Sequence, residues 1–489
     1  MGDRPLKITG FLVVAPSTIE VHEELSIGVK ALCEPYFAGS ACYGRLLAVQ
    51  GRYNLSPRGI AYMDNVPKDW DGAVQIRAAG GYRGPDGFSF TGRPRAYPGD
   101  LRPITRIGGL RFTEPGVKKI EVMDLATGAR GVSNPIDVSA QPLEERLYWG
   151  DLHSQTFFSD GLRVPEELYA FARHEAFLDI FALSDHSEML TDRQWEYFVG
   201  VTNDAYAPGA FTTFVGLEWT SPKFGHRNLH FPGDKAPCLR CNDPAYDELE
   251  KLYEAARNEG ALVVPHHSAN TVMGVDWSLG HDPQVERLVE IHSVWGNSER
   301  PASAGNLRPI RVLGGEKSGQ HVVDALKRGC RFGFVGGGDI HDGRPGDELH
   351  SRQKRPSMYR DLWRQGIMGV WAKKLTREAV FEALWNRRVY ATTNVRTIVR
   401  FSVCGQPMGS EVAHGGPRPI ALRASSEVPI SRVEIVRNGE DIVRLLPETY
   451  EVDFKAEDPG SGGADWYYAR ITREDGEMAW SSPVWVGNR

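Results

Sequence analysis

The chain has 489 residues, of which 41% are hydrophobic and 25% charged, the proportions of a water-soluble globular protein. This length exceeds what one ordinary core supports, so we expect two or three domains. A formal net charge of −6 gives no electrostatic attraction for nucleic acid or an anionic membrane, and no apolar run is long enough to cross a bilayer. The first residues show no secretory signal pattern, and the six cysteines do not form a disulfide framework. We therefore expect a cytoplasmic protein.

Residues 1–145 are expected to form a β-rich module. Short runs rich in β-branched residues, such as ITGFLVV and NPIDVS, are separated by glycine, proline and turn pairs. Regular turn punctuation of this kind is typical of an all-β unit. The sequence therefore predicts a β-sandwich at the N-terminal end of the chain.

Residues 146–390 alternate between strand-like apolar runs and amphipathic helical patterns. RVPEELYAFARHEAF predicts a helix with Pro165 in its first turn. DPAYDELEKLYEAARNEG predicts a second helix with Asp243 as its N-cap, Pro244 at its first position and Gly260 as its stop. LDIFALSD and ALVVPHH have the length and composition of buried strands. This alternation predicts a mainly parallel sheet or barrel, whose active site would lie at the C-terminal ends of its strands.

Residues 391–489 return to β character and are expected to form a second β-rich module. Runs such as ISRVEIVRNGEDIVRLL and DWYYARITREDG combine β-branched and aromatic residues with turn signals. The sequence shows no repeat of fixed period and no low-complexity tract. The expected order is thus a β module, an α/β unit and a second β module.

Histidines, carboxylates and one glutamine recur where six of the expected strands end. A single histidine after a strand is more typical of a solvated loop, but six similar strand ends favour a shared cluster of divalent metals. Neighbouring carboxylates resist ionisation unless cations neutralise them, and imidazoles add neutral ligands. The residues are Asp151, His153, Gln155 and Asp160; Asp185 and His186; Glu218 followed by His226 and His230; His266 and His267; Glu290 and His292; and Asp339, His341 and Asp342.

Other candidate features are weaker. Cys238 and Cys241 form a single CxxC, which is more typical of a reduced pair on a loop than of a structural zinc site. The glycine-rich VGGGDIHDGRPG matches no phosphate-loop template. Lys223, Arg227 and Arg344 flank the candidate ligands and could hold an anionic substrate by charge-assisted hydrogen bonds, although exposed loop residues are as often merely solvated.

The motifs DLHSQTFFSDG, ALSDH, GLEW…GHRNLHF, VVPHH and GGGDIHDG resemble, in this order, those of the PHP (polymerase and histidinol phosphatase) superfamily. The resemblance covers residues 148 to about 345. It implies an α/β fold with a distorted (β/α)7 barrel that holds two or three divalent ions, zinc, manganese or iron, flanked here by the two β-sandwich-like modules. GHRN, VEIHSVWGNSE and AWSSPVWV look further like a bacterial PHP-like branch known only as a domain of unknown function.

The resemblance also implies individual metal ligands. The matching positions are His153 of the His-x-His pair, Asp160 of the closing SDG, His186, the bridging Glu218, His266, and the final Asp339 and His341.

Two positions stay open within this ligand set. One further histidine is expected after Glu218, and His226 and His230 compete for it because their even spacing places both on one face of a strand; the GHRN phrase favours His226. Gln155 replaces the second histidine of the pair, and its amide oxygen suits a hard cation better than zinc. The centre would then hold either two or three metals.

The leading hypothesis is a metal-dependent hydrolase that uses a metal-bound hydroxide against a small, anionic phosphoester. His267 or Asp185 would protonate the leaving group, and Arg227 would hold the substrate. The choice of phosphate comes from the resemblance, because the ligands alone equally permit an amide, ester or lactone. A barrel that has lost catalysis and serves as a binding protein is the alternative from another class. No nucleic-acid or membrane partner is expected, and a homo-oligomer is left open.

Overall fold

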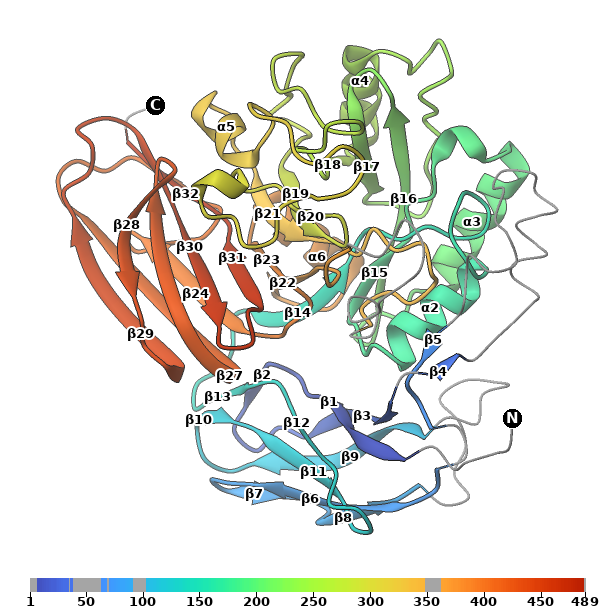
Figure 1. Ribbon diagram of the computed structural model, residues 1–489, viewed down its shortest axis with the longest axis vertical. Helices are drawn as coiled ribbons and strands as arrows, with labels where there is room; N and C mark the ends of the chain where they lie inside the picture. The colour runs from blue at the N-terminus through green and yellow to red at the C-terminus, as the bar shows by residue number, and fades with distance from the viewer. Residues whose placement is uncertain are drawn as a thin grey trace.

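The computed structural model describes residues 7–34, 36–37, 63–67, 70–90, 103–347 and 362–487. Figure 1 shows three parts: blue and cyan strands at the bottom, a central part with the helices, and a large orange and red sheet beside it. No helix of the described residues is long and apolar enough to cross a membrane. The fold is mixed α/β and consists mainly of strands.

The N-terminal part consists of short, mainly antiparallel strands. They are β1 (Ile8–Val14), β2 (Thr18–Glu20), β3 (Leu25–Cys33), β4 (Tyr36–Phe37), β5 (Met63–Asp64), β6 (Ala73–Ala78), β7 (Tyr82–Arg83), β8 (Gly87–Ser89), β9 (Ile104–Phe112), β10 (Gly116–Lys118), β11 (Ile120–Asp124), β12 (Arg130–Val132) and β13 (Ile136–Ser139). Larger sheets run β1-β3-β9-β7 and β12-β11-β6-β8. Buried and half-buried positions alternate along β11, as expected for strands with one face on a core. Ile27, Leu110 and Val122 are fully buried in that core.

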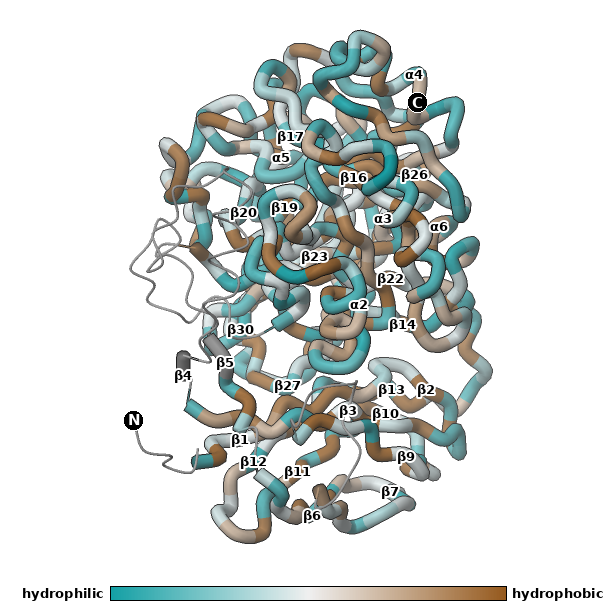
Figure 2. Tube along the Cα trace, turned by 90° about the vertical axis from the view of Figure 1, so that its right-hand side faces the viewer, coloured by the Kyte–Doolittle hydropathy of each residue, from teal (hydrophilic) through white to brown (hydrophobic). Residues whose placement is uncertain are grey.

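The central part contains all the described α-helices. Its elements are β14 (Arg146–Asp151), α2 (Pro165–His174), β15 (Ile180–Ala182), α3 (Asp192–Ala205), β16 (Thr212–Ser221), β17 (Gly225–Phe231), α4 (Leu249–Glu259), β18 (Leu262–Pro265), β19 (Leu288–Ser293), β20 (Gly296–Asn297), α5 (Val322–Lys327), β21 (Gly333–Gly336), β22 (Ile367–Ala372), α6 (Arg377–Trp385) and β23 (Val389–Thr392). In Figure 2 hydrophobic residues lie along β22, whose six residues are all buried.

The expected parallel alternation is present in only part of the central sheet. β14, β15 and β16 are parallel and are joined by α2 and α3, and β19 is parallel to β21. β17, β18, β22 and β23 pair antiparallel to their neighbours. Residues 222–224 are too few for a parallel crossover, which needs a dozen or more, so β16 and β17 form a hairpin. The described strand pairings therefore show a mixed sheet and no clear (β/α)7 barrel.

Helix ends follow local capping chemistry. Pro165 occupies the first position of α2, as expected, and Gly260 ends α4 in the left-handed conformation with φ 61°. The expected start of α4 is wrong, because the helix begins at Leu249. Asp243 instead accepts a hydrogen bond from the backbone N–H of Ala245 at 2.9 Å, so its side chain closes a local turn rather than capping the helix.

The C-terminal part forms one sheet with the central strands. Its strands are β24 (Ile398–Val403), β25 (Gln406–Pro407), β26 (Glu411–Val412), β27 (Arg418–Arg437), β28 (Glu440–Leu445), β29 (Thr449–Asp458), β30 (Asp465–Arg473), β31 (Met478–Ser481) and β32 (Val484–Val486). β31 pairs with β30 on one side and with β23 on the other. A boundary between residues 390 and 391 would cut through β23, whereas one at 145/146 falls directly before β14. The division into three domains stays a prediction.

Candidate metal centre

The strand ends of the central sheet bring the candidate ligands together. The turns after β14, β15, β18 and β21 and the strands β16 and β17 carry these residues. Apart from Gln155 and His230, the candidate ligands belong to groups of three side chains whose potential ligand atoms lie within 4.8 Å of one another, and Glu290 of β19 joins one of these groups. The groups are His226, His266 and His267; His153, Glu218 and His266; Asp160, His186 and His341; and His153, Glu290 and Asp339.

Glu218 lies at the centre of this cluster and is 1% exposed. Its Oε1 atom is 2.9 Å from His226 Nδ1 and 3.4 Å from His266 Nε2. Its Oε2 atom is 3.4 Å from His153 Nε2. Burial would raise the pKa of Glu218, but the surrounding histidines, His186 and His266 above all, hold it well below its usual range. The two oxygens of one ionised carboxylate therefore face two different sets of histidines.

A second acid, Asp160, joins two histidines on the more open side of the cluster. Its Oδ1 atom is 3.4 Å from His186 Nε2 and 3.3 Å from His341 Nε2. These three side chains are 10–17% exposed, whereas those of His153 and Glu218 are 1% exposed. A small molecule would therefore reach the cluster from the side of Asp160, His186 and His341.

The separations of 3.3–3.4 Å fit pairs of metal ligands better than hydrogen bonds, whereas the 2.9 Å between Glu218 Oε1 and His226 Nδ1 is also a hydrogen-bond distance. Two donor atoms about 2.0–2.1 Å from one tetrahedral ion lie about 3.3–3.4 Å apart, whereas charge-assisted hydrogen bonds are about 2.7–2.9 Å long. Among the described residues, His153 Nε2, both ring nitrogens of His266 and His267 Nδ1 are buried without a hydrogen-bond partner. Buried polar atoms without partners are costly and uncommon. The donor set therefore fits divalent metal ions.

Hydrogen bonds from neighbouring residues orient the candidate ligands. His153 Nδ1 lies 2.8 Å from Glu290 Oε2, which directs Nε2 toward Glu218. His186 Nδ1 lies 2.5 Å from Thr220 Oγ1, which directs Nε2 toward Asp160. The sequence placed Glu290 among the strand-end candidates without predicting that it would orient His153, and it gave no role to Thr220. The signal for Thr220 was its place two residues after Glu218, on the same face of β16.

Asp151 ties two of the ligand-bearing turns together. Its Oδ1 atom accepts hydrogen bonds from the backbone N–H groups of His153, at 2.9 Å, and Gly338, at 2.8 Å. These hydrogen bonds join the turn after β14 to the turn that carries Asp339, although Asp151 and Gly338 are 187 positions apart in the chain.

His230, the alternative to His226 as a metal ligand, lies beside the cluster but belongs to none of its groups among the described residues. His226 belongs to a group with His266 and His267, whereas His230 belongs to none of the groups of described residues. His230 packs against Gly216, where a Cβ atom would lie 2.8 Å from its Nδ1. Burial, followed by the nearby His153 and His266, lowers the pKa of His230 to about 3. The geometry thus favours His226.

Gln155 is brought into the cluster. It is fully buried, and its Nε2 atom donates a hydrogen bond to Glu218 Oε2 at 2.9 Å. Its Oε1 atom has no hydrogen-bond partner among the described residues.

Arg227 does not face the cluster, which corrects its expected role as a substrate-binding residue. Alternation along β17 places it on the opposite face from His226. Its Nε atom donates to Glu286 Oε1 at 2.7 Å, and its guanidinium also donates to the carbonyl of Phe224 at 2.7 Å. Tyr253 donates to the same Glu286 oxygen at 2.6 Å. Arg227 is thus part of a buried ion-pair network.

Asp185 holds a turn in place. Its carboxylate accepts hydrogen bonds from the backbone N–H and hydroxyl groups of Thr156 and Ser159, at 2.7–3.1 Å. This turn carries Asp160 into the cluster. Asp185 therefore has occupied oxygens and a positioning role, which disfavours the expected proton transfer to a leaving group.

His267 lies among the candidate ligands and not on the open side. Its side chain is 2% exposed, and its backbone has a positive φ of 32°. Burial, followed by the adjacent His266 and His226, lowers the pKa of His267 well below its usual value. A neutral imidazole is a nitrogen ligand and not a proton donor of the imidazolium type.

The remaining candidates form their own contacts elsewhere. Lys223 donates to Glu248 at 3.0 Å. The thiol of Cys241 donates to the carbonyl of Thr220 at 3.0 Å, and burial raises the pKa of Cys238 and of Cys241 to about 11. Neither cysteine belongs to a potential metal group of the described residues. Arg344 is also paired, with Asp347.

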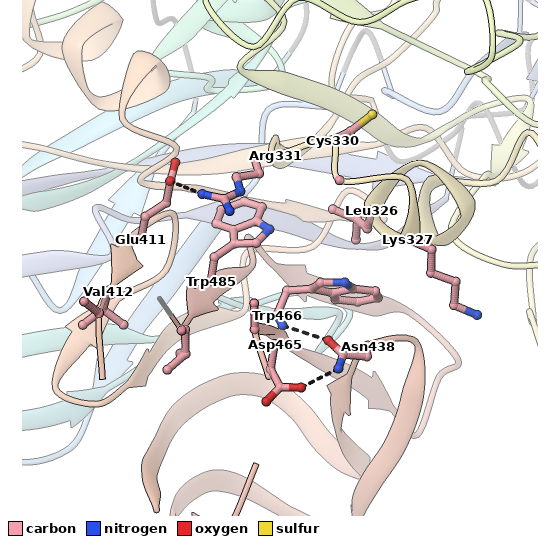
Figure 3. Close-up of a pocket in the computed structure, with 15 residues that line it drawn as sticks. Leu326, Lys327, Cys330, Arg331, Glu411, Val412, Asn438, Asp465, Trp466 and Trp485 are labelled. Carbon is pink, nitrogen blue, oxygen red and sulfur yellow. Dashed lines mark hydrogen bonds and ion pairs between the residues drawn. The ribbon is translucent and has the colours of Figure 1, made fainter. Parts of the chain in front are cut away.

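A separate cavity of about 560 Å³ lies between α5 and the sheet edge formed by β30 and β32. Figure 3 shows Trp466 and Trp485 side by side in its wall, with Arg331 paired to Glu411 and Asn438 bonded to Asp465. Its charged side chains thus already have partners, apart from Lys327. No potential metal group of the described residues lines it. We therefore place the candidate functional site at the metal centre.

Part of the chain matches the model of a protein family of unknown function. The model of that family, "protein of unknown function (DUF3604)", matches residues 163–287 and 329–414. Uncharacterised proteins of Chlamydia pneumoniae and Chlamydia trachomatis are each 30% identical to the chain over 399 and 400 residues. Each match covers 77% of this chain and 63% of the relative. The chain therefore spans less than two thirds of the length of these relatives.

Several solved structures are also similar to parts of the chain, and two of them are given below. One is a two-domain protein from Bacteroides vulgatus that contains a predicted PHP-like metal-dependent phosphoesterase. Its sequence is 14% identical to this chain, the match covers 70% of this chain and 96% of that protein's chain, and the TM-score is 0.36. The other contains fibronectin(III)-like modules of Clostridium thermocellum CbhA, with 21% identity over 18% of this chain and 94% of its own and a TM-score of 0.14. By sequence, the chain is thus similar to proteins of the DUF3604 family, whose function is unknown.

Proposed function

We propose that this protein is a metal-dependent hydrolase that acts on a phosphoester of a small, anionic substrate. The observation that carries the proposal is the position of Glu218. Its Oε2 atom lies 3.4 Å from His153 and its Oε1 atom 3.4 Å from His266, which are ligand-like separations, and several of the surrounding nitrogens have no hydrogen-bond partner among the described residues. A carboxylate shared in this way is typical of centres with more than one metal.

Two or three divalent ions, zinc, manganese or iron, would be held by this donor set. Bound metals of this kind polarise an ester and make water nucleophilic near neutral pH. The candidate ligands are His153, Gln155, Asp160, His186, Glu218, His226, His266, His267, Asp339 and His341.

The chain's own residues hold these donors in position. Glu290 orients His153, Thr220 orients His186, and Asp185 fixes the turn that carries Asp160. The arrangement is therefore preorganised, so no large movement is needed when a substrate arrives. The more exposed side, with Asp160, is the side from which substrate would enter.

The choice of a phosphoester comes from the ordered motifs that resemble the PHP superfamily. The donor set by itself also permits hydrolysis of an amide, carbon ester or lactone. Substrate chemistry is therefore the point that the experiment must decide.

The test is a substrate panel with the full chain, stripped of metal and then reloaded with Zn²⁺ or Mn²⁺. The panel contains p-nitrophenyl phosphate, bis(p-nitrophenyl) phosphate, p-nitrophenyl acetate, an anilide and a lactone. We expect turnover of a phosphate ester that is lost without metal and restored by it. Turnover of only the carbon ester, anilide or lactone would contradict the phosphoester assignment, and tight metal binding with no turnover at all would favour the binding-protein alternative.

A further inference from the structure

The two sides of Glu218 differ in the atoms they offer. Beside Oε1 lie the imidazoles of His186, His226 and His266, and the last two form a group with His267. Oε2 lies 3.4 Å from His153 Nε2, which is also 3.5 Å from Asp339 Oδ1, and His266 belongs to a group with His153 and Glu218 as well. The Oε1 side thus offers mainly nitrogen atoms, whereas the His153 side, which shares His266, offers more oxygen atoms.

Gln155 lies on the oxygen-rich side, and only the nitrogen of its amide has a hydrogen-bond partner among the described residues. Its Nε2 atom faces Glu218 Oε2 at 2.9 Å, and its buried Oε1 atom lacks a partner among the described residues. An ionised carboxylate accepts hydrogen bonds only, so without a cation the NH₂ group must be the end that faces it. A buried oxygen without a partner costs about 1–3 kcal/mol.

A half-turn of the Gln155 amide would exchange its oxygen and nitrogen without moving any other heavy atom. The amide oxygen would then lie 2.9 Å from Glu218 Oε2. Two oxygen ligands about 2.1 Å from one octahedral ion are about 3.0 Å apart. Two oxygens at this distance repel each other unless a cation lies between them, so the flipped amide is favourable only when metal is bound.

We propose that Gln155 is an oxygen ligand that makes the His153 side of the centre selective for an oxygen-preferring cation such as Mn²⁺, while the side of His226, His266 and His267 takes Zn²⁺. This inference rests on the proposed function in requiring that the centre binds metal. Carboxylate and carbonyl oxygens suit Mg²⁺ and Mn²⁺, whereas imidazoles suit Zn²⁺. With Gln155, three oxygens and the nitrogens of His153 and His266 would be available to the first position; a histidine at residue 155 would exchange one of these oxygens for a nitrogen.

The test measures which metals the protein retains, without any substrate. Metal-free full chain is incubated with equimolar Mn²⁺ and Zn²⁺ and desalted; bound metals are then measured by mass spectrometry, and Mn²⁺ by electron paramagnetic resonance. We expect the unaltered protein to retain both metals. Gln155→His should lower the retained Mn²⁺-to-Zn²⁺ ratio about tenfold or more, the scale on which altered metal surroundings change affinity, whereas Gln155→Glu should keep Mn²⁺.

His267→Gln is the matched control on the nitrogen-rich side. It should lower the retained Zn²⁺ and leave the Mn²⁺ signal in place. If Gln155→His does not fold, as judged by circular dichroism, Gln155→Ala replaces it and is expected to lose Mn²⁺ that Gln155→Glu retains.

Equal Mn²⁺-to-Zn²⁺ ratios in the unaltered protein and in Gln155→His would overturn the inference, as would retention of zinc alone by the unaltered protein. Both results would leave the proposed hydrolase standing. Selective retention of both metals in a protein that hydrolyses no ester would overturn the proposed function and support the inference.

Discussion

Replacement of Glu218 by glutamine removes one negative charge with almost no change of shape. Both oxygens of Glu218 accept a hydrogen bond, from Gln155 Nε2 at 2.9 Å and from Thr220 Oγ1 at 3.1 Å. Glutamine has only one acceptor oxygen, so one of these donors loses its partner at a cost of about 1–3 kcal/mol.

The larger effect of Glu218→Gln is on metal binding. Removal of a residue that only orients a ligand weakens metal affinity about 10–100-fold, and loss of a shared anionic ligand should exceed that. A hundredfold weakening removes about 2.7 kcal/mol of the stabilisation that saturating metal provides. The hydrogen-bond cost applies to the metal-free protein, whereas the stabilisation that metal adds to the free energy of unfolding should fall by about 2.7 kcal/mol or more.

Metal content, thermal unfolding with and without metal, and turnover together measure this prediction. Glu286→Gln is the matched control, because Glu286 is also a fully buried carboxylate but lies in the network with Arg227. The control should lose stability and keep its metal, whereas Glu218→Gln should lose both metal and activity while retaining its fold. Normal metal content in Glu218→Gln would refute the assignment of Glu218 as a ligand.

Three more predictions concern residues outside the centre. Arg470→Met should lower the free energy of unfolding in urea by about 3–5 kcal/mol, because Arg470 neutralises the buried Glu299; a change below about 1 kcal/mol would contradict this. Arg227→Met should reduce stability but lower turnover less than about tenfold, since its side chain belongs to an ion-pair network. A hundredfold loss of kcat in a folded, metal-loaded variant would show that Arg227 acts in the reaction. At pH 8 Cys238 and Cys241 should react with a disulfide reagent about 100-fold more slowly than an ordinary thiol, because burial raises the pKa of each to about 11 and leaves little thiolate. The reaction rate should rise toward pH 11. A rate at pH 8 that is typical of a free thiol would refute the burial argument.

The sequence was sufficient to predict that the candidate ligands converge. His153, His186 and Asp339 follow strands that are separated by many residues, yet C-terminal ends of parallel strands meet at one edge. The repeated placement of histidines and acids after such strands was therefore informative without any pairing information. The mixed α/β class and its β-rich flanks follow from the same patterns of period and punctuation.

Side-chain roles that depend on strand pairing could not be read in the same way. Arg227 is next to His226 in sequence but on the opposite face of β17, and only the pairing of β17 with β16 shows which face is buried against which partners. Asp185 is next to His186, yet its oxygens are engaged by the turn at Thr156. Neighbouring positions on a strand or at its end can thus have unrelated functions.

The sequence pattern also did not predict how many strands the mixed sheet would contain. Local propensity predicts that residues 391–489 form strands, but it does not tell which strand they join. The pairing of β31 with β23 adds the C-terminal strands to the central sheet. Pairings between strands distant in sequence depend on packing of the whole chain and not on local preference.

The most direct measurement of the central claim is metal analysis of the full chain purified without chelators. The account predicts at least two equivalents of tightly bound divalent metal per chain in the unaltered protein. It further predicts that substitution of Glu218 removes most of this metal. Less than one equivalent in folded protein, even after incubation with zinc and manganese, would contradict the account.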